Sequence, residues 1–351
     1  MLYNPFFLFR KRPQLLIFFV TARCDCRCRF CFYRRRVENP RAEKELTLEE
    51  IGRFSRFYGP LADLSISGGE PFLRKELEDI VRTFAINNRP KLIEIPTNGY
   101  RPETTAGLAD AFCRDFPGIR LVIQISADGP PRLHDQLRLR PGLFERARET
   151  SRALEKISTV RPNLNVQIVT VFSKDNRDRL DEFYREWIDK YFFHRLVLTP
   201  CVDESYRALV KGEDRKLYRR LETAVEGINR SRRADRFSRF SVAFHRAKEK
   251  AIERWEKDQN LGKYCRAGKS ILVLRENGDL SPCEPAEAGF GNIRDYGYDI
   301  RRGLKEKPAR DYFQNYRKIS AGCHCSWSCA QTNAFIHSPR CLLSLAGALR
   351  L

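Results

Sequence analysis

Residues 15–200 alternate short apolar segments with amphipathic stretches, and this alternation constrains the fold more than any other feature of the sequence. The apolar segments are rich in Val, Ile, Leu and Phe, and most run into polar or Gly-containing loops. Strands of this kind, alternating with helices, predict an α/β fold with a parallel sheet and helices outside it. Six units predict a partial (β/α)6 TIM-type barrel, with strands at 15–20, 61–67, 91–97, 120–126, 165–172 and 195–200.

Helical patterns lie between the expected strands. Thr47 is the expected N-cap of one helix, and Glu50 stands three residues on as its capping-box partner. Further helices are expected at roughly 73–88, 103–115, 142–157 and 176–190. This pattern assigns residues 1–204 to the barrel.

The pattern changes after residue 204. Residues 205–260 read as a basic helical connector with little strand character. Residues 261–351 are expected to form a smaller α+β domain that contains a hairpin at 271–283. Its turn is Asn277-Gly278, a tight-turn pair, and Cys265 and Cys283 flank it.

The cysteines are grouped. Nine of the twelve fall into two tight groups and the pair Cys265/Cys283. In the first group Cys24, Cys28 and Cys31 have the spacing C-x3-C-x2-C. Three thiolates on one loop can bind three irons of a 4Fe–4S cluster and leave the fourth iron open, although a zinc site remains an alternative. Cys26 falls outside this spacing, and we expect it to be a small buried residue that points away from the cluster.

Polar motifs follow four of the expected strands. In barrels of this type the chemistry lies at the carboxyl ends of the strands. We therefore expect one rim of the barrel to carry the motifs at 24–31, 68–71, 97–99 and 126–129.

The first cysteine loop resembles the signature of the radical S-adenosylmethionine (radical SAM) enzymes, C-x3-C-x-aromatic-C. Cys24, Cys28, Phe30 and Cys31 match it, and Gly68-Gly69-Glu70-Pro71 resembles the family's GGEP motif. The resemblance implies a 4Fe–4S cluster on Cys24, Cys28 and Cys31 and S-adenosylmethionine as the second cofactor. It further implies a cofactor-binding set of Phe30, Phe32, Gly68, Gly69, Glu70, Pro71, Thr97, Asn98, Ser126, Asp128 and Arg138.

The resemblance also implies roles within that set. Glu70 and nearby carbonyls would receive the methionine ammonium, while Phe30 and Phe32 would offer apolar surface beside the cluster and adenine. The stretch 126–138 resembles S-x-D-G…H-D-x-x-R, in which Ser126 and Asp128 would contact the ribose region. Arg138 would pair with the methionine carboxylate, a task that suits a guanidinium. Alternatively, Asp128 forms only a turn and Arg138 is a surface charge; His134 is expected to be structural.

The C-terminal cysteines resemble the SPASM/Twitch extension of this superfamily. The spacing Cys265-x12-Gly278-x4-Cys283 fits its opening, and Cys325-x3-Cys329 could be its closing pair. The resemblance implies one auxiliary 4Fe–4S cluster, with a four-cysteine zinc site as the alternative. Its expected ligands are Cys265, Cys283 and Cys329, with Cys325 or Cys323 as the fourth.

Glu284 directly follows Cys283. In some SPASM enzymes an acidic residue here takes a proton from the substrate, so Glu284 is a candidate catalytic residue. A supporting acid or a hairpin cap is the alternative interpretation.

The formal net charge is +20, a field that attracts anions. Expected partners are an acidic electron donor such as flavodoxin or ferredoxin, and a peptide or small-molecule substrate, for which the charge allows an anion. Peripheral contact with an acidic membrane surface stays open, as does a merely solvated basic surface. Grouped cysteines in a long chain, with no secretory signal or apolar run of about 18 residues, predict a cytoplasmic protein.

Together these features predict a radical SAM enzyme. Reductive cleavage of S-adenosylmethionine would give a 5′-deoxyadenosyl radical that abstracts hydrogen from a peptide or small metabolite, with the auxiliary cluster assisting oxidation or substrate binding. From a different class, the chain could be a non-catalytic metal-binding protein whose basic surface binds nucleic acid. The sequence contains no recognisable nucleic-acid module to favour it.

Overall fold

The computed structural model describes most of the chain. The described residues are 12–41, 44–188, 195–200, 213–232, 244, 247–248, 250–251, 254, 265–284, 286, 289–321, 332, 335–338 and 340–343.

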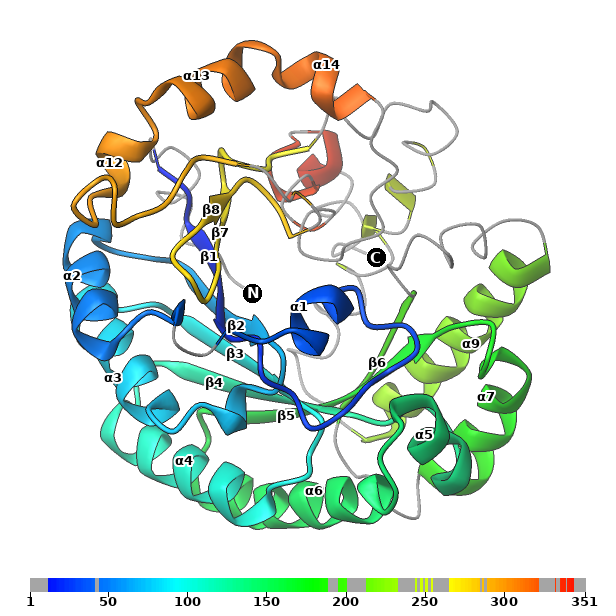
Figure 1. Cartoon of the computed structure of the whole chain (residues 1–351). Coiled ribbons are helices and arrows are strands. Elements are labelled where there is room, and N and C mark those ends of the chain that lie inside the picture. The colour runs from blue at the N-terminus through cyan, green and yellow to red at the C-terminus, as the bar shows by residue number, and fades with distance from the viewer. Residues whose placement is uncertain are drawn as a thin grey trace.

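A single sheet runs through these residues, in the strand order β6-β5-β4-β3-β2-β1-β7-β8. Strands β1 to β6 pair in parallel, each with its sequence neighbour. The sheet curves, with helices along its outside (Figure 1), which confirms the predicted α/β fold. The strands are β1 Leu15–Thr21, β2 Asp63–Gly68, β3 Leu92–Thr97, β4 Arg120–Ser126, β5 Leu164–Phe172, β6 Arg195–Pro200, β7 Ile271–Leu274 and β8 Leu280–Ser281.

The predicted hairpin is present, and it extends the barrel sheet. Strand β8 runs antiparallel to β7, and β7 pairs in parallel with β1. Gly278 lies in the turn with a φ of 91°, a value that favours glycine. The expected division at residues 204 and 260 stays a prediction.

Helices follow most strands. Of the expected set, the capping box is confirmed: the backbone N of Glu50 donates to Thr47 Oγ1 (3.2 Å), and the backbone N of Thr47 donates to Glu50 Oε2 (2.8 Å). Two short helices, α1 and α5, were not expected. The helices are α1 Arg34–Glu38, α2 Leu48–Tyr58, α3 Leu77–Asn88, α4 Pro102–Asp115, α5 Pro131–Arg138, α6 Leu143–Val160, α7 Leu180–Glu182, α9 Glu213–Arg232, α12 Ile300–Gly303, α13 Lys307–Gln314 and α14 Tyr316–Ala321. Short non-α turns lie at Pro71–Leu73, Arg177–Arg179 and Phe183–Trp187.

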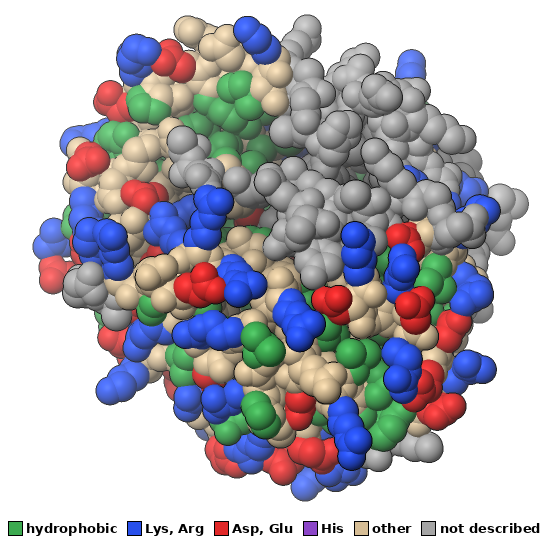
Figure 2. Space-filling view, turned by 45° about the vertical axis from the view of Figure 1, so that its right-hand side comes forward, with side chains coloured by type: hydrophobic (Ala, Val, Ile, Leu, Met, Phe, Trp, Pro, Cys, Tyr) green, Lys and Arg blue, Asp and Glu red, His purple; other side chains and the backbone are tan. Residues whose placement is uncertain are grey.

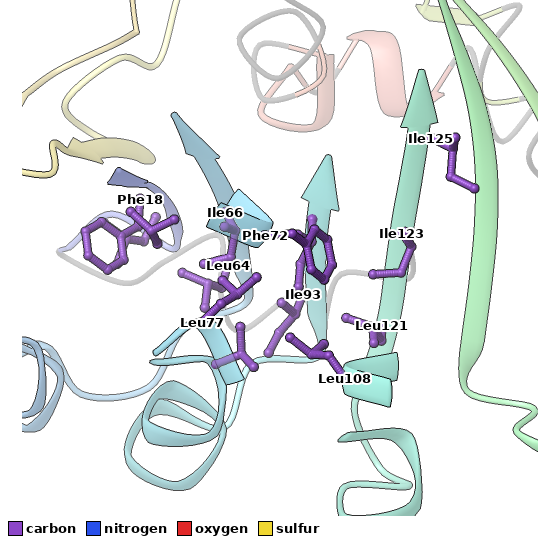
Figure 3. Packing of buried hydrophobic residues seen from close by; sticks show 14 of the residues in the cluster. Phe18, Leu64, Ile66, Phe72, Leu77, Ile93, Leu108, Leu121, Ile123 and Ile125 are labelled. Carbon is purple, nitrogen blue, oxygen red and sulfur yellow. The ribbon is translucent and has the colours of Figure 1, made fainter. Parts of the chain in front are cut away.

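The main core lies between the sheet and the outer helices. Alternate side chains of each strand point outward, because side chains on a strand have a period of two. Ile66, Ile93 and Ile123 are fully buried there, in one cluster with Leu77 of α3 and Leu108 of α4 (Figure 3). This layer fixes the positions of the strand ends on which the site is built.

The inner face of the sheet differs along its width. On β2 to β5 it is mixed, with the partly exposed polar residues Ser65, Glu94, Gln124 and Gln167 beside Val122 and Val169. On β1 and β7 it is apolar and covered by the segment leading into α1. The buried residues of that second cluster are Leu15, Ile17, Phe19, Ala22, Tyr33, Val37, Ile271 and Val273.

None of the described helices is long and apolar enough to cross a bilayer.

Candidate active site

The cysteine loop leaves the end of β1 and packs directly on the loop that follows β2. The backbone N of Gly69 donates to Thr21 O (2.8 Å), and the backbone N of Glu70 donates to Arg23 O (2.8 Å). A Cβ on Gly68 would lie 2.3 Å from Thr21 O, and one on Gly69 would lie 2.2 Å from Arg23 O. The two glycines are therefore required for this close backbone approach.

The other side of the cysteine loop rests on the C-terminal end of α5. The backbone N of Arg27 donates to Arg138 O (3.0 Å), and the backbone N of Arg29 donates to Leu137 O (3.1 Å). Terminal carbonyls of a helix have no partner within the helix, so the loop satisfies them. The predicted rim thus brings together the ends of β1 and β2 and the helix that follows β4.

The loop cysteines carry free thiols that lie close together. A hydrogen bond with Cys26 and the nearby Arg138 guanidinium lower the pKa of Cys28 to about 7. Burial, with Cys28 nearby, raises the pKa of Cys31 to about 12. Cys24, Cys28 and Cys31 are partly exposed, and their binding of a cluster stays a prediction.

Cys26 is buried, as expected, but its predicted direction is wrong. Its thiol hydrogen-bonds with those of Cys24 and Cys28, and these contacts raise its pKa above the ordinary range. Asn98 Nδ2 also donates to Cys26 Sγ (3.2 Å). The spacing rule could not foresee this, because it says nothing about which way an extra cysteine turns.

Asp25 lies beside these thiols. Its Oδ1 accepts from Asn98 Nδ2 (2.7 Å), whereas its Oδ2 is buried with no hydrogen-bond partner among the described residues. A carboxylate oxygen of Asp25 and the sulfurs of Cys24 and Cys26 lie within 4.8 Å of one another. An orphaned buried oxygen among free thiols fits a group bound against this loop.

Glu70 is buried under the rim and holds the end of β3. Its carboxylate accepts from Thr97 Oγ1 (2.9 Å), from the backbone N of Asn98 (2.7 Å) and from the backbone N of Phe72 (3.2 Å). Burial raises the pKa of Glu70 to about 7, and these donors oppose the shift. The sequence motifs at 68–71 and 97–99 therefore form one hydrogen-bonded unit.

Asp128 and Arg138 form a buried ion pair. Arg138 Nε donates to Asp128 Oδ2 (2.7 Å), and the backbone N of Val171 donates to Asp128 Oδ1 (2.9 Å). Arg138 Nη1 lies 3.9 Å from Cys28 Sγ. Asp128 is fully buried and both of its oxygens are engaged, one of them with Arg138, and its contact with ribose stays a prediction.

His134 is structural, as predicted. It is fully buried, and its Nδ1 accepts from the backbone N of Asp128 (3.1 Å). Burial and the nearby Arg138 lower its pKa to about 3, so the ring is neutral. Asn176, which sequence reasoning missed, donates to Asp128 O (2.9 Å) and completes this support.

The other side chains predicted to bind the cofactor differ in how exposed they are at the rim. Phe30 is buried and packs near Cys28 and Leu137, whereas Phe32 is half exposed beside the ring of Phe19. Ser126 is partly exposed at the end of β4, and Pro71 is buried in the turn after Glu70. Their contacts with a cofactor stay predictions.

The second cysteine site is only partly described. Cys265 and Cys283 lie at the two ends of the hairpin, which the backbone hydrogen bond from Gly268 N to Pro282 O (3.0 Å) draws together. Glu284 follows, partly exposed. Cys323, Cys325 and Cys329 lie outside the described residues.

Two further cysteines, Cys113 and Cys341, are buried and free. Cys113 packs in the main core on α4.

Comparison with known proteins places the barrel in a family. Residues 18–186 match the model of the radical SAM superfamily. A GTP 3′,8-cyclase of Pectobacterium atrosepticum is 33% identical over 98 residues, which are 26% of this chain and 29% of the cyclase. A cysteine-type anaerobic sulfatase-maturating enzyme of Clostridium novyi is 26% identical over 209 residues, 55% of this chain and 52% of that enzyme. The matches thus span about half or less of these relatives.

Solved structures resemble the chain over more of its length. A structure of anSMEcpe with bound AdoMet has a TM-score of 0.58 at 14% identity, covering 95% of this chain and 99% of that one. Streptococcus suis SuiB bound to S-adenosylmethionine has a TM-score of 0.57 at 18% identity, covering 86% of this chain and 68% of SuiB. At these identities the likeness shows the fold.

Residues 18–186 therefore form a radical SAM domain, the domain of enzymes that use a 4Fe–4S cluster and S-adenosylmethionine. The fold of the chain is like those of anSMEcpe and SuiB.

Proposed function

We propose that the protein cleaves S-adenosylmethionine at the Cys24–Cys28–Cys31 loop and uses the resulting radical to abstract hydrogen from a peptide substrate. When bound, the cluster would supply the electron that breaks the sulfonium bond and yields methionine and the 5′-deoxyadenosyl radical. The observation that carries this proposal is the rim itself. It carries the free thiols of Cys24, Cys28 and Cys31 and the orphaned Oδ2 of Asp25. The buried side chains of Glu70, Asp128 and Arg138 lie beside them.

Different rim residues would bind different groups of S-adenosylmethionine. Arg138 Nε donates to Asp128 and its Nη1 contacts Cys28 Sγ (3.9 Å), so Nη2 would be the first donor to the methionine carboxylate. Glu70 would receive the ammonium. Its pKa of about 7 would fall beside that charge, because a nearby cation favours the carboxylate. Gly68 and Gly69 keep the two loops close enough for one ligand to touch both.

The inner face of the sheet favours a substrate rich in hydrogen-bonding groups. Ser65, Glu94, Gln124 and Gln167 line β2 to β5, and Gln124 Nε2 lies 3.4 Å from Gln167 Oε1. Burying an apolar chain against Ser65 and Glu94 would remove these polar groups from water without giving them a partner, which is costly. A peptide offers donors and acceptors along its whole backbone.

Two relatives in fold also favour a peptide. Structures of anSMEcpe with a Cp18Cys peptide and of SuiB with the precursor peptide SuiA are known. Both resemble this chain at TM-scores above 0.5. A small metabolite stays the alternative substrate.

We further propose one auxiliary 4Fe–4S cluster on Cys265, Cys283 and Cys329, with Cys323 or Cys325. It would carry away an electron in a net oxidation or bind the substrate, and Glu284 would accept the substrate proton. Two described thiols at the base of one hairpin support this proposal. The free thiols also suit a reducing compartment such as the cytoplasm.

Electrons would come from an acidic donor protein such as flavodoxin. Arg27, Arg29, Arg34 and Arg35 are exposed along and just after the cysteine loop, where charge complementarity would steer such a donor. Over the face in Figure 2, basic and acidic side chains are interspersed, so the net charge is not gathered into one patch there.

Anaerobic purification followed by iron and sulfide counting tests the proposal. Reduction with dithionite in the presence of S-adenosylmethionine should then yield 5′-deoxyadenosine, measured by mass spectrometry. An iron-free, zinc-loaded, colourless protein that forms none would overturn it. A steep loss of affinity for nucleic acid with added salt would instead support the non-catalytic binding function.

A further inference from the structure

The hairpin carries two buried charged residues between β7 and its turn, Arg275 and Glu276. Each is 5% exposed. A buried charge costs several kcal/mol unless it is paired or hydrogen-bonded, so the partners of these two side chains explain why they are there.

Glu276 reaches the segment that follows the first cysteine group. Its Oε2 accepts from the Tyr33 hydroxyl, and its Oε1 accepts from Arg36 Nη1 (2.9 Å). Tyr33 stands two residues after Cys31, and Arg36 lies in α1. One carboxylate therefore fixes both the exit of the cysteine loop and the helix beyond it.

Arg275 reaches in the opposite direction, to the segment that follows Cys283. Its Nη2 donates to Glu284 O (2.9 Å) and to Ala286 O (2.9 Å). The guanidinium also lies over the rings of Phe19 (5.3 Å) and Tyr33 (5.8 Å), where cation–π attraction adds to the contact.

We propose that Arg275 and Glu276 are positioning residues that fix the two cysteine sites relative to one another. Adjacent in sequence, they hold the segment after Cys31 with one side chain and the segment after Cys283 with the other. This inference rests on the proposed function for its purpose, because transfer between two sites depends on their separation. Its geometry stands on the described contacts alone.

The planar shape of the Arg275 guanidinium suits the contacts that it makes. One planar fork contacts two carbonyls and two rings, whereas a lysine ammonium is a point charge on a flexible stem. Arg275→Lys therefore keeps the charge but cannot reproduce every contact.

Hydrogen exchange of the full, cluster-loaded chain, read by mass spectrometry, tests the inference. Arg275→Gln should raise exchange at 283–286 by about tenfold, read chiefly on the Ala286 amide that donates to Cys283 O (3.3 Å), because the segment whose carbonyls Arg275 holds would open more often. Glu276→Gln should raise exchange across 33–37 instead, and Arg275→Lys should give an intermediate rise at 283–286. Unchanged exchange at 283–286 in Arg275→Gln would overturn the proposal.

Arg294→Gln is the matched control. Arg294 links the same two parts of the chain through a two-pronged bond to Glu50 (2.6 and 3.0 Å), but it contacts neither cysteine segment. It should leave exchange at 33–37 and 283–286 unchanged. An equal rise in exchange at 33–37 and 283–286 in Arg294→Gln would show that loss of any contact between the two parts has this effect. That result would overturn the specific role of Arg275 and Glu276.

The two proposals fail separately. If the wild-type protein forms no 5′-deoxyadenosine, the proposed function fails, while the exchange pattern still decides whether Arg275 and Glu276 hold the two segments.

Discussion

The two cysteine sites of this protein are assembled in different ways. The first is one short loop, held by backbone hydrogen bonds from the loop after β2 and from the end of α5. The second begins at the two ends of a hairpin that joins the barrel sheet beside β1. The first site depends on ligands within eight residues, and the second depends on strand pairing between distant segments. We expect the first to bind the cosubstrate and the second to serve a later step.

Loss of one loop cysteine is the largest change expected. Cys28→Ala should abolish 5′-deoxyadenosine formation and remove roughly half of the iron if both sites hold a 4Fe–4S cluster. Iron analysis and mass spectrometry measure the two effects. Cys113→Ala is the control, because Cys113 is buried in the core on α4. It should retain both iron and cleavage.

The close approach of the two loops predicts the next largest effect. In Gly69→Ala the new Cβ would meet Arg23 O at 2.2 Å, so the cysteine loop must move and cosubstrate cleavage should be largely lost. Gly107→Ala on α4 is the control, since nothing lies within 4 Å of its Cβ position. It should stabilise the helix by about 1 kcal/mol. Equal cleavage in both variants would contradict a tightly packed first site.

The buried ion pair below the loop predicts a stability effect. Arg138→Gln leaves the carboxylate of Asp128 buried without its cation, which should cost about 3–5 kcal/mol in urea unfolding. Arg140, whose guanidinium lies 4.1 Å from the Tyr100 ring centroid, is the surface control. Arg140→Gln should cost at most about 1 kcal/mol. Similar losses would mean that Arg138 acts as a surface charge after all.

The raised pKa of Glu70 predicts the smallest effect, a change in how the free energy of unfolding depends on pH. Burial raises this pKa from 4.5 to about 7, so the folded state keeps a proton that the unfolded state releases within that window. In the cluster-free protein, Glu70 therefore lowers stability as the pH rises from about 4.5 to 7. Glu70→Gln removes this loss, and its stability relative to wild type should rise by up to about 3 kcal/mol between about pH 5 and pH 8. Urea unfolding at the two pH values measures it, and a pH-independent difference would contradict the raised pKa.

Much of the barrel follows from local sequence. The predicted strands match the observed ones within a few residues, because alternating apolar side chains and polar loop residues mark each strand directly. The rim motifs were also found, since the carboxyl ends of parallel strands meet at one edge. The hydrogen bonds among the rim residues were not predicted. Asp128 pairs with Arg138, and Glu70 pairs with Thr97 and Asn98, because separate segments pack together.

Contacts between distant segments could not be predicted. Nothing near the hairpin in sequence says that β7 pairs with β1, so the sequence predicts no partners for Arg275 and Glu276. Their one available signal was position, directly after a fully apolar strand. The direction of Cys26 was missed for a related reason, because it depends on Asn98 from the loop after β3.

The division of labour between the two sites is the central claim, and Cys283→Ala tests it most directly. After reduction with S-adenosylmethionine present, 5′-deoxyadenosine formation by this variant should stay close to that of wild type, while Cys28→Ala forms none. Because formation is measured without added substrate, the result does not depend on knowing the peptide. Equal loss of 5′-deoxyadenosine in both variants would contradict the account.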